Sequence, residues 1–218
     1  MLVLPKIKIA ANVDMVCFDK TGTLTESEPD FHGMVPVIYQ AFAPLQKGAV
    51  IWPNRLRQAA AVCNSLTYLD RGITVGDAAQ KTLLKVVEAH FLGRNTVVLP
   101  LPPSGKGKAK MCTLTVLRRF GFEAPLLRSG VVAVDGAAAA NTAVLFVHGA
   151  PSVIEQLVSK DTLPSDYCQV IDDYSSRSFR VLAVAAGKLH GLDQVDMSSA
   201  TLQQLESCCE LHLIDCPE

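Results

Sequence analysis

The alternation of apolar and polar positions divides the 218-residue chain into short elements of both kinds. Early in the chain, apolar residues recur at helical spacing in two segments, 54–69 and 77–92, and we expect a helix in each. Asp77 suits the N-cap of the second helix, and Gly93 suits its C-terminal stop. The later pattern predicts helices over 151–159, 166–176 and 198–209.

Short runs rich in β-formers predict strands between these helices. Residues 13–18 are expected to form a buried strand, and residues 130–136 and 142–148 a hairpin. Further strands are expected over 113–122, 179–187 and 210–215, an irregular connection with one short strand over 28–53, and a loop over 99–110. The pattern therefore predicts an α+β fold, an antiparallel sheet flanked by helices.

Composition narrows the class of protein. Apolar residues make up 49% of the chain and charged residues 19%, as in a globular protein with a core. The net charge of −1 gives no basic field, so we expect no nucleic-acid partner. The seven cysteines are scattered without the spacing of a zinc site and are expected to be reduced thiols. No run approaches the ~18 apolar residues of a membrane span.

The string DKTGTLT, residues 19–25, carries the clearest chemistry. Asp19 follows an apolar run, where a carboxylate could attack a phosphoryl group and form an aspartyl-phosphate. Lys20 offers a charge for a phosphate oxygen, Gly22 allows close backbone approach, and Mg²⁺ would be held by Asp19 and Thr21. The simpler alternative is that Asp19 only caps a turn.

DKTGTLT resembles the phosphorylation motif of the P-type ATPases, and the resemblance continues along the chain. The opening PKIKIAANVDMVCFDKTGTLT is similar to the entry of the phosphorylation (P) domain in type V members. Later segments resemble their GDPxEKA box, the strand pair around the adenine site, the KGAPE box and the strand ARVLALGYK; these are 61–85, 117–134, 146–157 and 178–189. Within type V, QKTLLK after Asp77 favours the endoplasmic-reticulum subgroup of polypeptide helix dislocases over the endolysosomal polyamine transporters.

This resemblance implies a division of the chain into three parts. Residues 1–29 would begin a haloacid-dehalogenase-like α/β P domain, 30–205 would form the nucleotide-binding (N) domain, and 206–218 would return toward the P domain. The full-length protein would be a membrane ATPase of the endoplasmic reticulum that uses ATP and Mg²⁺, with this chain on the cytosolic side. Its partners would be the remaining P, actuator and transmembrane domains. The fragment alone is expected to be monomeric and inactive, because the GDGxND loop that binds Mg²⁺ has no counterpart in it.

The resemblance also assigns site residues. Phe122 would stack on adenine, with core packing beside Phe120 on the same strand face as the alternative. Arg180 would contact phosphate, and Arg128 would lie beside the binding strand. His148 and Gly149 fall on the lysine and glycine of the KGAPE box, where the glycine allows close backbone approach.

Several positions depart from the family pattern. Histidine and leucine replace two lysines at His148 and Leu127, and Ser152, Ala78 and Gln80 also replace family residues. The loss of two lysines predicts weak nucleotide binding, unless cations of the preceding loop, Lys106, Lys108 and Lys110, compensate. A degenerate nucleotide-binding or regulatory module is therefore the alternative function. A soluble aspartyl phosphatase is disfavoured, because Thr21 stands where such enzymes carry a second acid.

Overall fold

A computed structural model describes residues 12–20, 22–26, 30–49, 52–69, 74–102, 110–136, 143–189 and 199–214. The chain divides into two units, Met1–Asp30 and Phe31–Glu218, which are described separately. The predicted compensating residues Lys106 and Lys108 lie outside the described residues, as does Thr21.

In the first unit, the expected buried strand over 13–18 is wrong. None of these residues is in a strand, and the apolar side chains of Met15 and Phe18 are 80% and 65% exposed. A strand is stabilised by ladder hydrogen bonds to a neighbour and by burial of its side chains, and the described part of this unit gives 13–18 neither. Apolar composition alone therefore did not produce a strand here.

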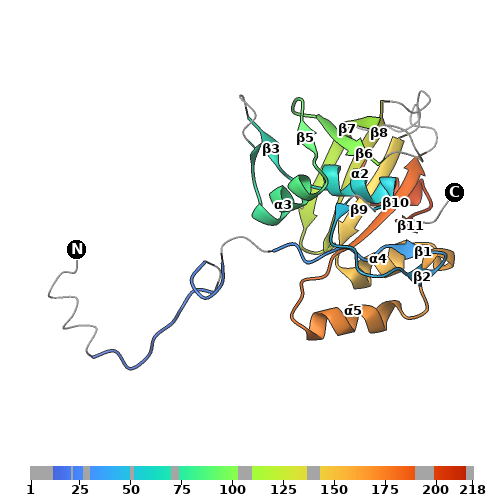
Figure 1. Cartoon of the computed structure of the whole chain (residues 1–218). Helices are drawn as coiled ribbons and strands as arrows, with labels where there is room; N and C mark the ends of the chain where they lie inside the picture. Colours follow the sequence, from blue (N-terminus) through green and yellow to red (C-terminus); the bar gives the residue numbers. More distant parts are fainter. Residues whose placement is uncertain are drawn as a thin grey trace. The chain divides into compact units, whose positions relative to one another are not determined.

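The second unit is built on one seven-stranded antiparallel sheet of order β11-β10-β9-β8-β7-β6-β5 (Figure 1). Its strands are β5 (His90–Phe91), β6 (Thr96–Leu101), β7 (Lys110–Glu123), β8 (Arg128–Asp135), β9 (Ala143–Gly149), β10 (Ala183–Leu189) and β11 (His212–Leu213). The predicted α+β fold is confirmed, and so is the antiparallel pairing of β8 with β9. Strands β5 and β6 were not predicted. Residues 90–91 of β5 fall in the helix expected over 77–92, and residues 99–101 of β6 fall in the loop expected over 99–110 from its prolines, glycines and lysines.

Side chains alternate across the central strands and build two cores. Val131, Val144 and Phe146 point to one face, where they join the first core with α2 (Asn54–Val62) and α3 (Ala78–Val86). Val132, Leu145, Val147 and Ala185 point to the other face, into a second core. Elements α4 (Pro151–Leu157), α5 (Tyr167–Ser176) and α6 (Leu202–Ser207) supply Ile154, Tyr167, Leu202 and Leu205 to that second core.

Both early helices begin where the sequence predicts and end sooner. Helix α2 stops at Val62, because the Asn64 side chain donates to the carbonyl of Ala61 and accepts from the amide of Leu66. Helix α3 has its predicted N-cap, with Asp77 Oδ1 accepting from the Gln80 amide at 3.1 Å. It ends at Val86 and not before Gly93, because Glu88 adopts a left-handed backbone with φ of 56°.

Short hairpins complete the second unit. Strands β1 (Val37–Ile38) and β2 (Ala41–Phe42) pair within the predicted irregular connection, which thus holds two short strands. Strands β3 (Thr67–Tyr68) and β4 (Thr74–Val75) pair after α2. A 3₁₀ turn, η3 (Lys160–Thr162), follows α4.

No helix in the described ranges is long and apolar enough to cross a membrane. The six cysteines in those ranges form no disulfide.

Candidate functional site

In the first unit, the described residues of the DKTGTLT segment, 19–20 and 22–25, form a turn. The carbonyl of Lys20 accepts hydrogen bonds from the amides of Leu24 and Thr25, at 3.0 and 3.1 Å. Gly22 takes a φ of 79°, a left-handed conformation that glycine adopts without a Cβ clash. The turn closes directly behind Asp19, whose side chain is exposed.

Asp19 and Lys20 are both solvent-accessible, so the local geometry allows a phosphoryl group to reach the carboxylate. Among the described residues, no group of three or more His, Cys, Asp or Glu side chains could hold a metal ion. Asp19 fits Mg²⁺ as one carboxylate ligand, since this ion binds through one or two carboxylates together with substrate phosphates and waters.

In the second unit, the expected nucleotide residues lie at one end of the sheet. His148 on β9 pairs with Ser129 on β8 and with Val184 on β10, so these three residues form a row across the strands. The row belongs to the face of Val131 and Phe146, because alternate residues of a strand share a face.

Phe122 extends this row onto β7 through a β-bulge. Phe120 pairs with Gly130 and Glu123 pairs with Arg128, so two residues, Gly121 and Phe122, stand opposite the single residue Ser129. The expectation that Phe120 and Phe122 share a face is therefore wrong, because the bulge breaks the alternation. Phe120 packs against the second core, whereas Phe122 is 64% exposed. An exposed aromatic ring at the end of the row is free to stack on a base.

His148 is half-buried in the middle of the row. Burial lowers the pKa of its imidazole to about 4, because the charged form would lose hydration. Its Nδ1 atom is buried and has no hydrogen-bond partner. At pH 7 this position therefore carries no charge, and a ligand could use the imidazole only as a neutral hydrogen-bonding group.

The close backbone approach predicted at Gly149 is present, and the atoms that approach it belong to Leu127 and Arg128 of the same chain. It pairs with Arg128 on one side and Ala183 on the other. A Cβ atom added here would meet the Leu127 carbonyl oxygen and would lie 2.7 Å from Arg128 Cβ. The next amide, of Ala150, donates to the same Leu127 carbonyl at 3.0 Å. Glycine is thus required by the packing of β9 against the turn before β8.

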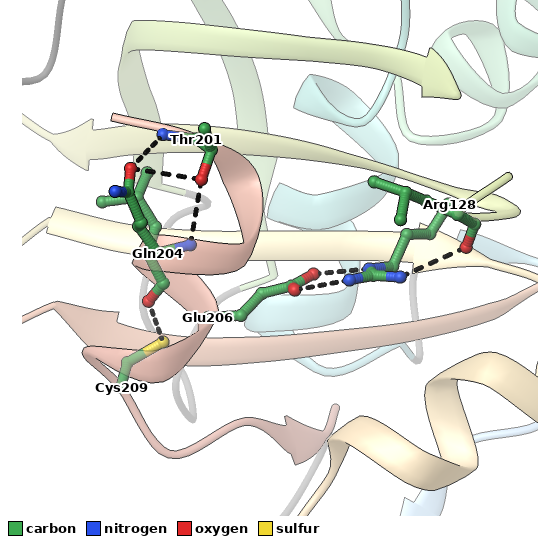
Figure 2. A network of polar contacts seen from close by, with 7 residues as sticks. Arg128, Thr201, Gln204, Glu206 and Cys209 are labelled. Carbon is green, nitrogen blue, oxygen red and sulfur yellow. Dashed lines mark hydrogen bonds and ion pairs between the residues drawn. The ribbon is translucent and has the colours of Figure 1, made fainter. Parts of the chain in front are cut away.

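Arg128 is engaged inside the protein. Its Nε and Nη2 atoms each lie 2.7 Å from an oxygen of Glu206, and both side chains are more than 90% buried (Figure 2). The hydrogen bond to Glu206 also raises the pKa of the arginine. The guanidinium therefore has a carboxylate partner already.

Arg180 lies three residues before β10 begins and is exposed. The predicted strand over 179–187 was placed too early, since β10 runs from Ala183 to Leu189. The preceding residue, Phe179, is held by ring contacts to His32 and Tyr174, with centroids 4.2 and 5.9 Å away. The ring contacts of Phe179 thus fix the backbone next to Arg180, whose side chain is exposed to solvent.

Sequence reasoning missed one cation on the row's face. Arg119 on β7 pairs with Val131, and its Nη1 donates to the carbonyls of Val62 and Asn64 at 2.6 Å each. Its Nη2 is buried without a partner. Alternation along β7 sends Arg118 and Arg119 to opposite faces, but only the pairing with β8 shows that Arg119 is the one on the face of the row.

No protein-family model matches this chain. Over 206 residues, covering 84% of the chain, it is 32% identical to human polyamine-transporting ATPase 13A2. It is 33% identical over 222 residues to the mouse 13A2 protein, and 29% identical over 217 residues to the mouse probable cation-transporting ATPase 13A5. These alignments cover 92% and 93% of the chain.

The chain spans only 17% to 18% of the length of these three relatives. All three are transporting ATPases by name, which supports a relation of this chain to the P-type ATPases. The likeness and the antiparallel sheet with flanking helices agree with the fold of an N domain of that family.

Proposed function

We propose that this chain is the nucleotide-binding part of the catalytic region of a P-type ATPase, joined to the segment that accepts the phosphoryl group. The observation that carries the proposal is similarity over 84% to 93% of the chain to transporting ATPases, together with the exposed Asp19 and Lys20 of the DKTGT string. In the full-length protein Asp19 attacks the γ-phosphoryl group of ATP, forms an aspartyl-phosphate and displaces ADP, while Lys20 and Thr21 bind the phosphoryl oxygens. Mg²⁺, held in part by Asp19 and Thr21, supplies charge neutralisation when bound.

In the second unit, the adenine ring of ATP stacks on Phe122, and the phosphates of the nucleotide extend toward Arg180 and the turn after Gly149. The support is the row of Phe122, Ser129 and His148, with an exposed ring at its end. Since His148 is neutral and Leu127 is apolar, this face holds less positive charge than two lysines would give. The division into 1–29, 30–205 and 206–218 stays a prediction, and this proposal counts α6 and β11, which pack with the sheet, with the nucleotide-binding part.

For the full-length protein we propose polyamine transport across a membrane, with this chain on the cytosolic side. The sequence favoured the polypeptide helix dislocases of the endoplasmic reticulum on the segment QKTLLK. The relatives named above include two polyamine-transporting ATPases, and this observation favours the other type V subgroup. The alternative function, a degenerate nucleotide-binding module, rests on the loss of charge at 127 and 148.

The test of nucleotide binding is an NMR titration of the 218-residue chain with a non-hydrolysable ATP analogue. We expect a dissociation constant on the order of millimolar, about −4 kcal/mol. Because base–aromatic stacking contributes ~1–3 kcal/mol, Phe122→Ala should abolish most of the nucleotide-induced shifts. His148→Lys should tighten binding at pH 7, since it adds a charge near the phosphates.

Tyr39→Ala is the matched control, because Tyr39 is also an exposed aromatic residue, 79% accessible, and lies outside the row. It should bind the analogue as the wild type does. Unchanged affinity in a folded Phe122→Ala protein would refute the site. No binding even by the His148→Lys protein would favour the degenerate module.

A further inference from the structure

The buried ion pair between Arg128 and Glu206 joins two elements that are far apart in the sequence. Helix α6 presents Glu206, and β8 begins with Arg128. A buried ion pair is costly to desolvate and persists only with good geometry and further hydrogen bonds. This pair has both: two parallel hydrogen bonds of 2.7 Å, and a third bond from Arg128 Nη1 to the carbonyl of Leu126 at 3.2 Å.

Helix α6 is fixed so that it can hold the carboxylate in place. Thr201 and Gln204 form a capping box at its start, with each side chain bonded to the other residue's backbone amide (Figure 2). Leu202 and Leu205 are buried in the second core, and Leu202 lies against Gly130 of β8. The helix is therefore anchored independently of Glu206.

The third hydrogen bond, from Arg128 to the carbonyl of Leu126, connects the ion pair to the turn between β7 and β8. This turn is closed by the amides of Leu126 and Leu127, which donate to the Glu123 carbonyl at 3.0 and 2.8 Å. Leu127 has a left-handed backbone with φ of 51°, a conformation that costs free energy in a residue with a Cβ atom. The bond from Arg128 to Leu126 thus supports a strained turn.

The same turn contacts both sides of the proposed nucleotide site. Phe122 stands at the bulge just before it. After it, the Leu127 carbonyl accepts the Ala150 amide, and Gly149 packs against Leu127 and Arg128. A shift of the turn would therefore change the distance between the ring of Phe122 and the turn after Gly149.

We propose that Arg128 and Glu206 are a positioning pair: they hold the 124–127 turn and so set the spacing between Phe122 and the Gly149–Ala150 turn that nucleotide binding requires. Neither residue touches the nucleotide. This inference rests on the proposed function, and it gives Arg128, which the resemblance placed beside the binding strand, a role that acts through other residues.

The experiment compares wild-type chain with Glu206→Gln, which keeps the shape and removes the charge. Two quantities are measured: affinity for the non-hydrolysable ATP analogue by NMR titration, and amide hydrogen exchange at Ala150 and at Leu99 of β6. We expect affinity to fall at least fivefold and the Ala150 amide to exchange at least tenfold faster, with Leu99 unchanged. Arg128→Lys, which keeps the charge with a single donor group, should give a smaller change of the same kind.

Two control variants separate positioning from general stability. Asp173→Asn removes a carboxylate from an exposed ion pair with Arg177 on α5, so it should leave affinity and Ala150 exchange unchanged. Leu99→Ala opens a cavity in the first core and lowers overall stability, so it should speed exchange broadly without weakening nucleotide binding in the folded protein.

The outcomes distinguish this inference from the proposed function. If wild type binds the analogue and Glu206→Gln binds equally well, the positioning role is refuted and nucleotide binding stands. If exchange rises equally at Ala150 and Leu99, the pair serves stability alone and the inference also fails. If wild type binds no analogue, nucleotide binding is refuted, and the positioning of a nucleotide site fails with it; Ala150 exchange then decides only whether the pair holds the turn.

Discussion

At the scale of single residues, His148 links stability to pH. Its pKa is about 4 in the fold and ordinarily 6.5, so the unfolded chain takes up a proton first as pH falls. The contribution of His148 to the free energy of unfolding is therefore complete above pH 6.5 and is lost as the pH falls from 6.5 to 4. The loss should reach about 2 to 3 kcal/mol, at ~1.4 kcal/mol per pKa unit.

Chemical denaturation of wild type and His148→Gln between pH 7.5 and 4 measures this effect. The variant should lose less stability over that range than wild type. His90→Gln is the matched control, because His90 is exposed on the edge strand β5, and its pH profile should follow that of wild type. Parallel profiles for wild type and His148→Gln would show that the imidazole is hydrated and free to ionise.

At the scale of elements, the junction of β8 and β9 depends on Gly149. An added Cβ would lie 2.7 and 2.8 Å from Arg128 Cβ and Cα, so the backbone must move. Gly149→Ala should therefore lower the free energy of unfolding by about 1–3 kcal/mol, as overpacking does. It should also weaken nucleotide binding, because the same contact spaces the turn from Phe122.

Gly121→Ala is the control for this substitution. Gly121 lies in the bulge of β7, and no atom lies within 4 Å of a Cβ built there. The free energy of unfolding of Gly121→Ala, measured by thermal unfolding, should differ from that of the wild type by less than about 0.5 kcal/mol. Equal destabilisation by the two variants would show that loss of glycine flexibility, and not the contact with Arg128, sets the cost at position 149.

At the scale of the whole molecule, catalysis should require more than these 218 residues. The described part of the chain gathers no cluster of acidic, histidine or cysteine side chains around Asp19 that could complete a Mg²⁺ site. We expect no sustained ATP turnover from the chain alone. In the full-length protein, labelled ATP should form an acid-stable, hydroxylamine-sensitive phosphoenzyme that Asp19→Asn abolishes, because an amide is a poor nucleophile.

The control for this last experiment is Asp14→Asn, since Asp14 is another exposed aspartate of the same segment. It should label as wild type does. Normal labelling of Asp19→Asn would place the acceptor elsewhere. Steady turnover by the 218-residue chain that is lost on Asp19→Asn would show that the fragment needs no further domain.

The sequence by itself determined the α+β class, most of the sheet, the N-cap of α3 and the turn that follows Asp19. These follow from local rules: alternation of side chains, capping chemistry and glycine's access to positive φ. The resemblance to the P-type ATPases also singled out Phe122, whose stacking on adenine stays a prediction. The ends of α2 and α3 escaped it, because Asn64 and Glu88 end them through conformations that composition does not encode.

Only the tertiary structure decided which side chains are exposed to a ligand and which are already paired or buried inside the protein. The bulge at Phe122 depends on the pairing of β7 with β8, and it separates this ring from Phe120. Arg128 finds its carboxylate 78 residues away, on a helix that reaches it only when the second core has formed. The exposed apolar segment 13–18 gives the converse case, since strand formation needs a partner that a pattern of residues cannot supply. Long-range pairing and burial, not residue type, thus set the roles of these side chains.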